Sequence, residues 1–303
     1  MKKNIPIRIK VLSVGGRGAN ILERLGFLEK KGVDRVGVGI ESKVFNRLDI
    51  KKKIVLRKEE GLESSGNKEM RLGDILEEKK QDIIATLRDT DALFLIGNLA
   101  NTTTHLQVAM IAQIAKELGI LTFFVGATPF LFEGKKKILH AKENAEYLEK
   151  YVDAVLLLDS DKVNIQNILA FEAMTKIDTL VGNIISAVVE LVQKFGIVNV
   201  DFADLKTTIQ DAGEVFFNEV TLSKENLDTL NTELFEKNTL FQKKKKLQKI
   251  LYVIYGGTDL LMEEVQMIGE KLQEQFDKQS RIIFGVVNDE KMKNDLRVVM
   301  IGA

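Results

Sequence analysis

The sequence predicts an α/β protein with a Rossmann-like parallel sheet domain, a long central helix and a smaller α+β domain at the C-terminal end. Short β-branched, apolar segments alternate with helical patterns over the first half of the chain, which is typical of a parallel sheet covered on both faces. A helical pattern then runs from Ile177 to Val192. After it, apolar segments follow one another more closely, which indicates a second sheet.

The first apolar segment, Ile7 to Val14, leads into the glycine turn Gly15-Gly16-Arg17-Gly18 and then a helical pattern from Asn20 to Leu28. A further helix is predicted over 106–118, with Gly119 ending it in the left-handed conformation. More buried strands are predicted at 33–40, 92–96, 120–125 and 152–158. Strand, glycine turn and helix in this order are typical of a nucleotide-binding sheet.

The central helix carries apolar residues at spacings of three and four until Phe195-Gly196. About 20 helical residues span ~30 Å, so this helix is expected to join two domains. Beyond it, strands are predicted at 249–255, 281–288 and 296–301, with a helix over 261–276. We therefore expect a nucleotide-binding-like domain over 1–166, the central helix over 167–196 and a C-terminal domain over 197–303.

Composition excludes several classes of protein. The 44 Lys and Arg balance 44 Asp and Glu, so no overall charge attracts nucleic acid, and we expect no nucleic-acid partner. The chain has no cysteine and two histidines, which argues against disulfides, thiolate catalysis and a dedicated metal site. No apolar run approaches the ~20 residues of a transmembrane segment, and Met1 to Asn4 lead straight into a strand, so we expect a cytoplasmic protein. The basic run Lys243 to Lys246 indicates a solvated turn or a weak contact with anionic lipid.

The glycine turn supports three interpretations. Backbone N–H groups at Gly15, Gly16 and Gly18, together with a helix N-terminus, favour phosphate binding. The same glycines also suit a purely structural tight turn. A dinucleotide site is the third interpretation, with Glu41 placed to hold a ribose, although Ile21 stands where G-x-G-x-x-G has its last glycine.

A second cluster, Asn199, Asp201 and Asp204, follows the central helix. Asp201 is a good candidate to cap a new helix, with Asp204 in the first turn, where negative charge is favourable. The same amide and carboxylates are also able to position and polarise a water molecule when an electrophile is brought to them.

Several segments together resemble the FtsZ family of the tubulin superfamily. Residues 199–206 (NVDFADLK) resemble its synergy loop, and residues 129–137 (PFLFEGKKK) its ribose-side loop. Residues 114–122, 256–260, 282–287 and 296–301 match in order and spacing. The resemblance implies a GTP- or GDP-binding domain, with Mg²⁺ only if nucleotide binds, and head-to-tail filaments with itself or an FtsZ paralogue. In such filaments Asn199, Asp201 and Asp204 would act in trans, over a neighbouring subunit's GTP.

The resemblance also implies which residues surround the nucleotide. Asn20 matches the guanine-side asparagine, Glu133 matches the ribose ligand, and Lys137 stands in place of an arginine. Phe171 is either a base-stacking side chain or a core residue. Together with Gly15, Gly16, Gly18 and Thr103, these are the expected cofactor-binding residues.

The chain departs from the family at its phosphate loop. The family's GGGTGTG falls on Ala100 to Leu106, where only Thr103 matches. Because the missing glycines allow positive φ and close approach to phosphate, the change predicts weak binding, or a rebuilt loop in which Thr102 to Thr104 cap the next helix. Gly39 to Glu41, Ser64-Ser65 and Thr175 also differ from the nucleotide loops that the resemblance implies.

The sequence therefore predicts a divergent FtsZ-like cytoskeletal protein with weakened or lost GTP binding, which assembles with or modulates FtsZ-type filaments. The alternative is an active, polymerising GTPase with rebuilt nucleotide loops. A nicotinamide-dependent enzyme is the third hypothesis.

Overall fold

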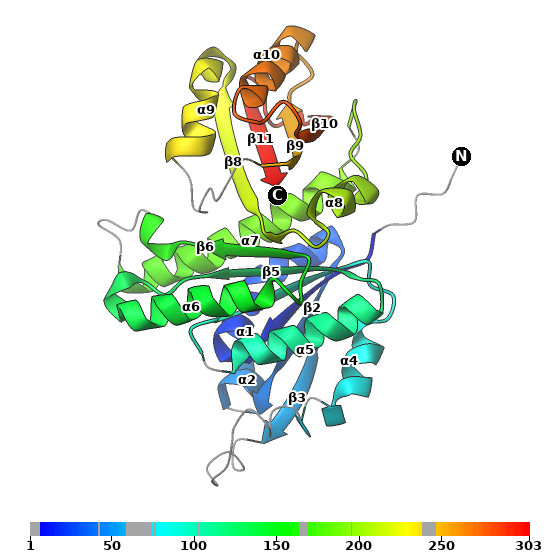
Figure 1. The fold of residues 1–303 in the computed structure, drawn as a ribbon, viewed down its shortest axis with the longest axis vertical. Coiled ribbons are helices and arrows are strands. Elements are labelled where there is room, and N and C mark those ends of the chain that lie inside the picture. Colours follow the sequence, from blue (N-terminus) through cyan, green and yellow to red (C-terminus); the bar gives the residue numbers. More distant parts are fainter. Residues whose placement is uncertain are drawn as a thin grey trace. The chain divides into compact units, whose positions relative to one another are not determined.

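The computed structural model describes residues 7–41, 43–58, 74–75, 77–101, 103–163, 169–194, 196–237 and 247–303. The chain forms two compact units, Met1–Ser186 and Ala187–Ala303 (Figure 1). The three-part division expected from the sequence stays a prediction. Ser64, Ser65, Thr102 and the basic run 243–246 lie outside the described residues.

The first unit is built on a parallel sheet. Its strands lie in the order β3-β2-β1-β4-β5-β6, and each neighbouring pair is parallel. The strands are β1 (Ile9–Val14), β2 (Val33–Glu41), β3 (Lys52–Lys58), β4 (Ala92–Gly97), β5 (Leu121–Ala127) and β6 (Ala154–Leu158). Because the strand order reverses between β1 and β4, the carboxyl ends of these two strands form a topological switch point, where ligands bind in such sheets.

Helices cover both faces of this sheet (Figure 1). One face packs its apolar side chains, such as Leu12 and Val36, against buried residues of three helices. These helices are α4 (Lys80–Leu87), α5 (Thr104–Glu117) and α6 (Lys135–Leu148). On the other face lie α1 (Gly15–Arg24) and the first turns of α7 (Ala170–Gln193). An ion pair between Arg24 of α1 and Asp178 of α7, at 3.3 Å, holds these two helices together.

The first helix begins earlier than predicted. The sequence pattern placed its start at Asn20, but α1 begins at Gly15, directly after β1, and a 3-10 helix follows over Leu25–Lys31. Gly15 has φ +74°, a left-handed conformation that glycine adopts without strain, so the chain turns from strand to helix in one residue. The prediction for Gly119 is confirmed, since it ends α5 with φ +75°.

The second unit contains a mixed sheet of four strands in the order β10-β9-β11-β8. The strands are β8 (Phe216–Ser223), β9 (Lys249–Gly256), β10 (Arg281–Asn288) and β11 (Asp295–Gly302). β10 pairs with β9 in parallel, whereas β11 is antiparallel to both of its neighbours. Around them lie the last turns of α7, α8 (Phe202–Ile209), the short strand β7 (Gly213–Glu214), α9 (Leu230–Thr232) and α10 (Met262–Gln273). The predicted α+β character of this part is thereby confirmed.

A charged network ties the last turns of α7 to this sheet. The Arg297 guanidinium donates to Glu190 and to Glu219, both at 2.7 Å, and lies 4.9 Å above the ring of Tyr255. Lys194, just after α7, pairs with Asp289 at 2.9 Å. These contacts fix the end of the long helix within the second unit.

Candidate functional site

The three glycines of the turn after β1 have different surroundings. Gly15 has a positive φ, and a Cβ there would lie 3.8 Å from Oγ1 of Thr104, so the start of α5 is adjacent. A Cβ on Gly18 would lie 2.7 Å from the carbonyl oxygen of Ile96, so this glycine lets α1 pack closely on β4. Gly16 is exposed, and a Cβ there would meet no atom within 4 Å. Gly15 and Gly18 are thus required by the fold, whereas Gly16 leaves the first turn of α1 open to a ligand.

Arg17 and Asn20 occupy the first turns of α1. Both terminal nitrogens of Arg17 lie 3.8 Å from the sulfur of Met174 in α7. Phe171 lies one turn before Met174, which places its backbone near the glycine turn; its side chain is outside the described part of the structure. Asn20 is exposed on α1. The turn and the start of α7 therefore lie together, as the expected site requires.

Asp178 is a residue of this region that the sequence reasoning missed. Its carboxylate is largely buried, and burial raises its pKa, whereas the charges of Arg17 and Arg24 oppose that rise. The sequence feature that could have indicated it is its position, because Asp178 is an acidic residue within the otherwise apolar stripe of the central helix. A buried carboxylate with two arginines beside the glycine turn makes this part of the unit polar.

In the loop between β4 and α5, backbone N–H groups donate hydrogen bonds to acceptors of the same loop. The side-chain oxygen of Asn98 accepts the N–H of Ala100 at 3.1 Å, and that of Asn101 accepts the N–H of Thr103 at 3.3 Å. The carbonyl of Asn98 accepts the N–H of Asn101 at 3.2 Å. Among the described residues of the loop none has a positive φ. Three backbone donors at this switch-point loop are therefore occupied within the loop itself.

Thr103 does not cap α5 through its side chain. It stands at the N-cap position, but its hydroxyl makes no capping hydrogen bond. The expectation that the threonines cap this helix is therefore wrong for Thr103, because its hydroxyl donates to Oδ1 of Asn101 at 3.4 Å and its backbone is helical rather than extended. Thr104 is the first residue of α5 and is buried against Gly97.

Glu133 and Lys137 lie together after β5. Glu133 ends a short 3-10 helix, Leu131–Glu133, and its Oε1 accepts the N–H of Phe130 at 3.1 Å. Its Oε2 lies 4.0 Å from Nζ of Lys137 in the first turn of α6. One carboxylate oxygen is therefore used in the local turn, and the other lies beside an exposed ammonium group and keeps capacity to accept a hydroxyl. Beside it, Leu131 and Phe132 are exposed to 55% and 74%.

In the second unit, Asp201 and Asp204 form a reciprocal cap at the start of α8. Oδ1 of Asp201 accepts the N–H of Asp204 at 2.9 Å, and Oδ2 of Asp204 accepts the N–H of Asp201 at 3.0 Å. The capping interpretation is thus confirmed. Asn199 accepts the N–H of Gly196 at 2.7 Å, which fixes the turn before α8. Each carboxylate keeps one oxygen outside the reciprocal pair, and Asp201 is exposed.

The residues fit a bound nucleotide unevenly. The first turn of α1 fits a phosphate, because Gly16 is open and no side chain caps the helix. The loop after β4 fits less well, since the N–H groups of Ala100, Asn101 and Thr103 are occupied within the loop and its described residues have no positive φ. The first turn of α5 has no side-chain cap, as in α1. Within the described residues there is no cluster of three His, Cys, Asp or Glu suited to a metal ion. The described helices also include none that is long and apolar enough to cross a bilayer.

A doubly wound parallel sheet with a glycine turn at its switch point, followed by a long helix and a mixed sheet, defines a nucleotide-binding class of α/β protein. Comparison with known families is more specific. Residues 8–167 match the Tubulin/FtsZ family, GTPase domain, and residues 228–303 match the FtsZ family, C-terminal domain. The chain belongs to the tubulin/FtsZ family and is an FtsZ-like protein of this cytoskeletal superfamily. A family match through both parts of the chain leaves no support for the dinucleotide interpretation.

Individual relatives agree with this assignment. The chain is 27% identical over 300 residues to the cell division protein FtsZ of Wigglesworthia glossinidia brevipalpis, covering 97% of this chain and 78% of the relative. It is 28% identical over 308 residues to cell division protein FtsZ 1 of Methanocaldococcus jannaschii, covering 97% and 82%. A solved structure of a mutant FtsZ from M. jannaschii superposes with a TM-score of 0.80 at 25% identity, covering 98% and 91%. CetZ2 from Haloferax volcanii, solved as a GTPγS-bound protofilament, shares the fold with a TM-score of 0.81 at 15% identity, covering 98% and 92%.

Proposed function

We propose that this protein is a divergent, cytoplasmic FtsZ-like subunit whose own GTP or GDP site is weakened or lost. In this proposal it assembles with, or modulates, filaments of an FtsZ paralogue or of itself through head-to-tail contacts. Mg²⁺ is expected to bind only if nucleotide binds. We assign the protein to cell division, because the relatives are named cell division proteins.

The observation that carries the proposal is the occupied loop after β4. A phosphate loop binds by presenting free backbone N–H groups, but Ala100 and Thr103 donate theirs to asparagine side chains. Releasing each such bond costs about 1 kcal/mol before any contact with phosphate forms. Two such bonds lower affinity by about one to two decades, in addition to the loss of close approach at the glycine positions.

The carboxylates of the synergy-type segment support a role in trans. Asp201 and Asp204 use one oxygen each to begin α8, so the helix start itself positions their other oxygens. A water molecule that attacks a phosphate needs orientation more than covalent chemistry. We assign Asn199, Asp201 and Asp204 to this role at the nucleotide of a partner subunit.

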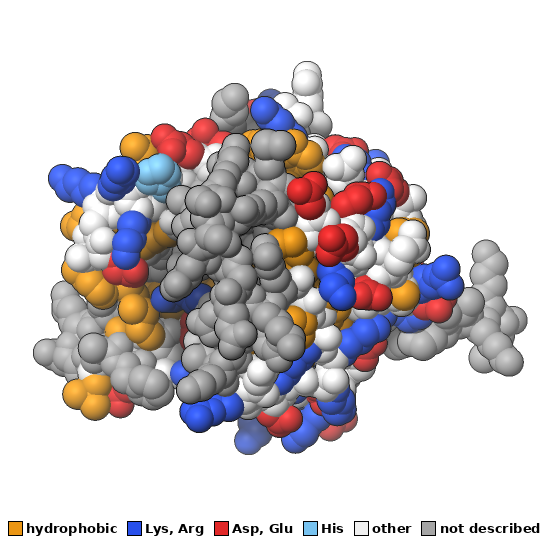
Figure 2. Space-filling view, turned by 90° about the horizontal axis from the view of Figure 1, so that it is seen from below, with side chains coloured by type: hydrophobic (Ala, Val, Ile, Leu, Met, Phe, Trp, Pro, Cys, Tyr) orange, Lys and Arg blue, Asp and Glu red, His pale blue; other side chains and the backbone are white. Residues whose placement is uncertain are grey.

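Exposed apolar side chains offer contact surface for such stacking. In the first unit Leu131 and Phe132 protrude beside Glu133, and in the second unit Leu261 and Met262 are exposed to 58% and 74% at the start of α10. Two different patches of this kind suit a heterologous contact, which stays open-ended and builds a filament. Figure 2 shows basic and acidic side chains interspersed over the described surface that it displays, which supports a protein partner over nucleic acid.

The alternative is an active, polymerising GTPase with rebuilt loops. It is favoured by one observation, the open first turn of α1 at Gly16, which remains able to receive a phosphate. In this alternative the loop after β4 rearranges when nucleotide arrives.

The two functions are separated by measuring GTP turnover and sedimentation in three samples: the protein alone, an FtsZ from the same cell alone, and their mixture. The proposal predicts no turnover and no polymer from the protein alone, and a changed turnover or shorter filaments in the mixture. Turnover and pelleting of the protein alone would support the active GTPase instead. A mixture that behaves as the sum of its parts would contradict the assignment to a mixed filament.

A further inference from the structure

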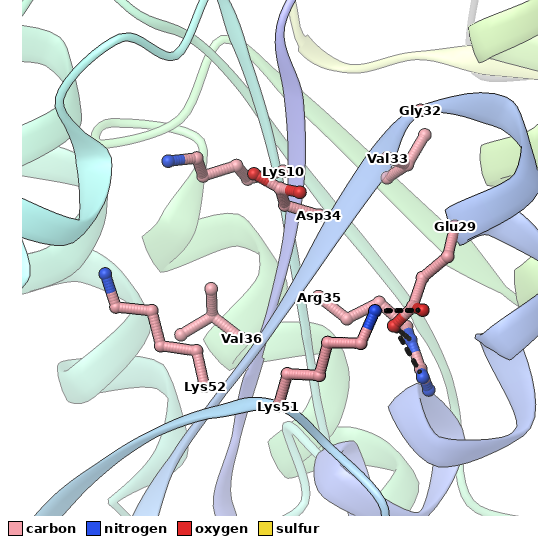
Figure 3. Close-up of a pocket in the computed structure, with 9 residues that line it drawn as sticks. All are labelled: Lys10, Glu29, Gly32, Val33, Asp34, Arg35, Val36, Lys51 and Lys52. Atoms are coloured by element: carbon pink, nitrogen blue, oxygen red, sulfur yellow. Dashed lines mark hydrogen bonds and ion pairs between the residues drawn. The ribbon is translucent and has the colours of Figure 1, made fainter.

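We propose that the pocket at the amino ends of β1, β2 and β3 is a binding site for a small phosphate-type oxyanion, held by the ammonium groups of Lys10 and Lys52 (Figure 3). The pocket has a volume of about 360 Å³, which suits a ligand of the size of pyrophosphate or a small phosphate ester. It lies at the strand ends opposite to the glycine turn, which follows the carboxyl end of β1. It is therefore separate from the nucleotide-type site.

Strand register places the two lysines on one face of the sheet. Lys10 of β1 is the partner of Asp34 of β2, and Val36, two residues further on, is the partner of Lys52 of β3. Because alternate residues of a strand share a face, Lys10, Asp34, Val36 and Lys52 lie on one face of the sheet, as two neighbouring pairs. Figure 3 shows the amino groups of Lys10 and Lys52 extending to the same side.

The two ammonium groups have few compensating anions. Lys10 donates to two backbone carbonyls at the end of α4, Thr86 at 2.7 Å and Arg88 at 3.4 Å, and to no carboxylate within 4.0 Å among the described residues. Lys52 makes no ion pair with any part of the chain that the structure describes. Burial lowers the pKa of Lys10, Asp34 raises it, and the charge of Lys52 lowers it again. A bound dianion would offset both the burial of Lys10 and its repulsion from Lys52.

The remaining charged groups of the pocket are already paired with one another. Arg35 donates to Glu29 at 2.8 Å, and Lys51 pairs with the second oxygen of Glu29 at 3.0 Å, as the dashed lines in Figure 3 show. One carboxylate is thus shared by two cations, so this side of the pocket keeps a net positive charge. Asp34 lines the pocket beside Lys10, and both Asp34 and Asp89 act on the Lys10 ammonium by raising its pKa. Asp34 provides an acceptor for a hydroxyl of a phosphate ester.

The test is a titration with pyrophosphate and with inorganic phosphate, followed by the amide NMR signals of the full chain. Shifts are expected at residues 33–36 and 51–53. Lys52→Gln should weaken the affinity about tenfold, as loss of a hydrogen bond to a charged group does. The matched control is Lys53→Gln, which removes the same charge from the opposite face, where Lys53 donates to the carbonyl of Asn46. This control should bind like the unchanged protein.

Three outcomes would overturn the proposal. They are no shift at concentrations on the order of tens of millimolar, shifts confined to residues 15–18, and equal weakening by both lysine variants. Citrate in parallel separates phosphate from carboxylate recognition, and binding of citrate without pyrophosphate would also contradict it. Thermal unfolding of both variants checks that they are folded. Because the readout is local to β2 and β3, its result is independent of whether GTP binds at the glycine turn.

Discussion

At the scale of single residues, the glycines of one motif have separable roles. Gly15 permits a left-handed start to α1 and Gly18 permits close packing on β4, so neither requires a ligand to explain it. Gly16 has neither constraint, so ligand binding would explain why this position is a glycine. In this motif Gly15 and Gly18 therefore serve the fold, and Gly16 is the position open to a ligand.

This difference predicts the stability of two alanine variants. Gly18→Ala should destabilise the protein by about 1 to 3 kcal/mol, because its Cβ would overlap the backbone carbonyl of Ile96 at 2.7 Å. Gly16→Ala should change the free energy of unfolding by less than about 1 kcal/mol, since its Cβ would point into open space. Urea unfolding of both variants measures the difference. Equal stability of the two would contradict this packing argument.

Asp201 allows capping and catalysis to be separated with two variants. Asp201→Ala should cost about 1 kcal/mol of stability, because the N–H of Asp204 loses its acceptor. Asp201→Asn should keep the cap, since Asn is an equally good N-cap residue, but it removes the carboxylate. If Asp201 acts on a partner's nucleotide, the Asn variant stays stable and still loses its effect on FtsZ turnover. An Asn variant with normal stability and an unchanged effect on turnover would leave capping as the whole explanation.

At the scale of elements, the sequence predicted best the segments that are buried on both faces. Strands β1, β4, β5, β9 and β11 are mostly apolar and largely buried, and the structure confirms them. Strand β3 was not predicted, because it is flanked and interrupted by lysines, and β8 was not, because its alternation includes Asn218 and Glu219. The Asn98 and Asn101 turns depend on side-chain orientation rather than on any periodic pattern. A departure from the family at the phosphate loop stays a prediction from the sequence, and the hydrogen bonds within this loop could not be predicted from it.

The attachment of α7 to the second sheet predicts an acid dependence. The hydrogen bond from Lys194 lowers the pKa of Asp289. A lowered folded-state pKa stabilises the protein above the unfolded value of about 3.9, and this contribution is lost as pH falls through the folded value. Lys194→Met should therefore reduce stability at pH 7, and its difference from the unchanged protein should shrink below about pH 4.

The control for this experiment is Lys271→Met. Lys271 pairs with Asp228, whose side chain is 92% exposed, so its loss should cost little at any pH. Urea unfolding between about pH 7 and pH 3 gives both curves. A Lys194→Met difference that stays constant over this range would show that the stabilisation does not come from the ion pair with Asp289.

At the scale of the whole molecule, the chain matches the family in both of its parts. The synergy-type segment at Asn199 to Asp204 begins its helix with both carboxylates in place. In the loop after β4, by contrast, the N–H groups of Ala100 and Thr103 donate to asparagine side chains of the same loop. This contrast is the basis of our proposal that the subunit acts on a neighbour's nucleotide in mixed filaments.

Isothermal titration of the purified protein with GTP and GDP measures directly how strongly its own site binds nucleotide. We expect a Kd in the high micromolar range or weaker, because the N–H groups of Ala100 and Thr103 are occupied. A variant with glycine at Ala100, Asn101, Thr102, Thr104 and Leu106 should bind more tightly than the unchanged chain. We expect this recovery to be partial, because the sequence also predicts departures from the family at Thr175 and at Gly39 to Glu41. Submicromolar binding of GTP by the unchanged protein would contradict a weakened site.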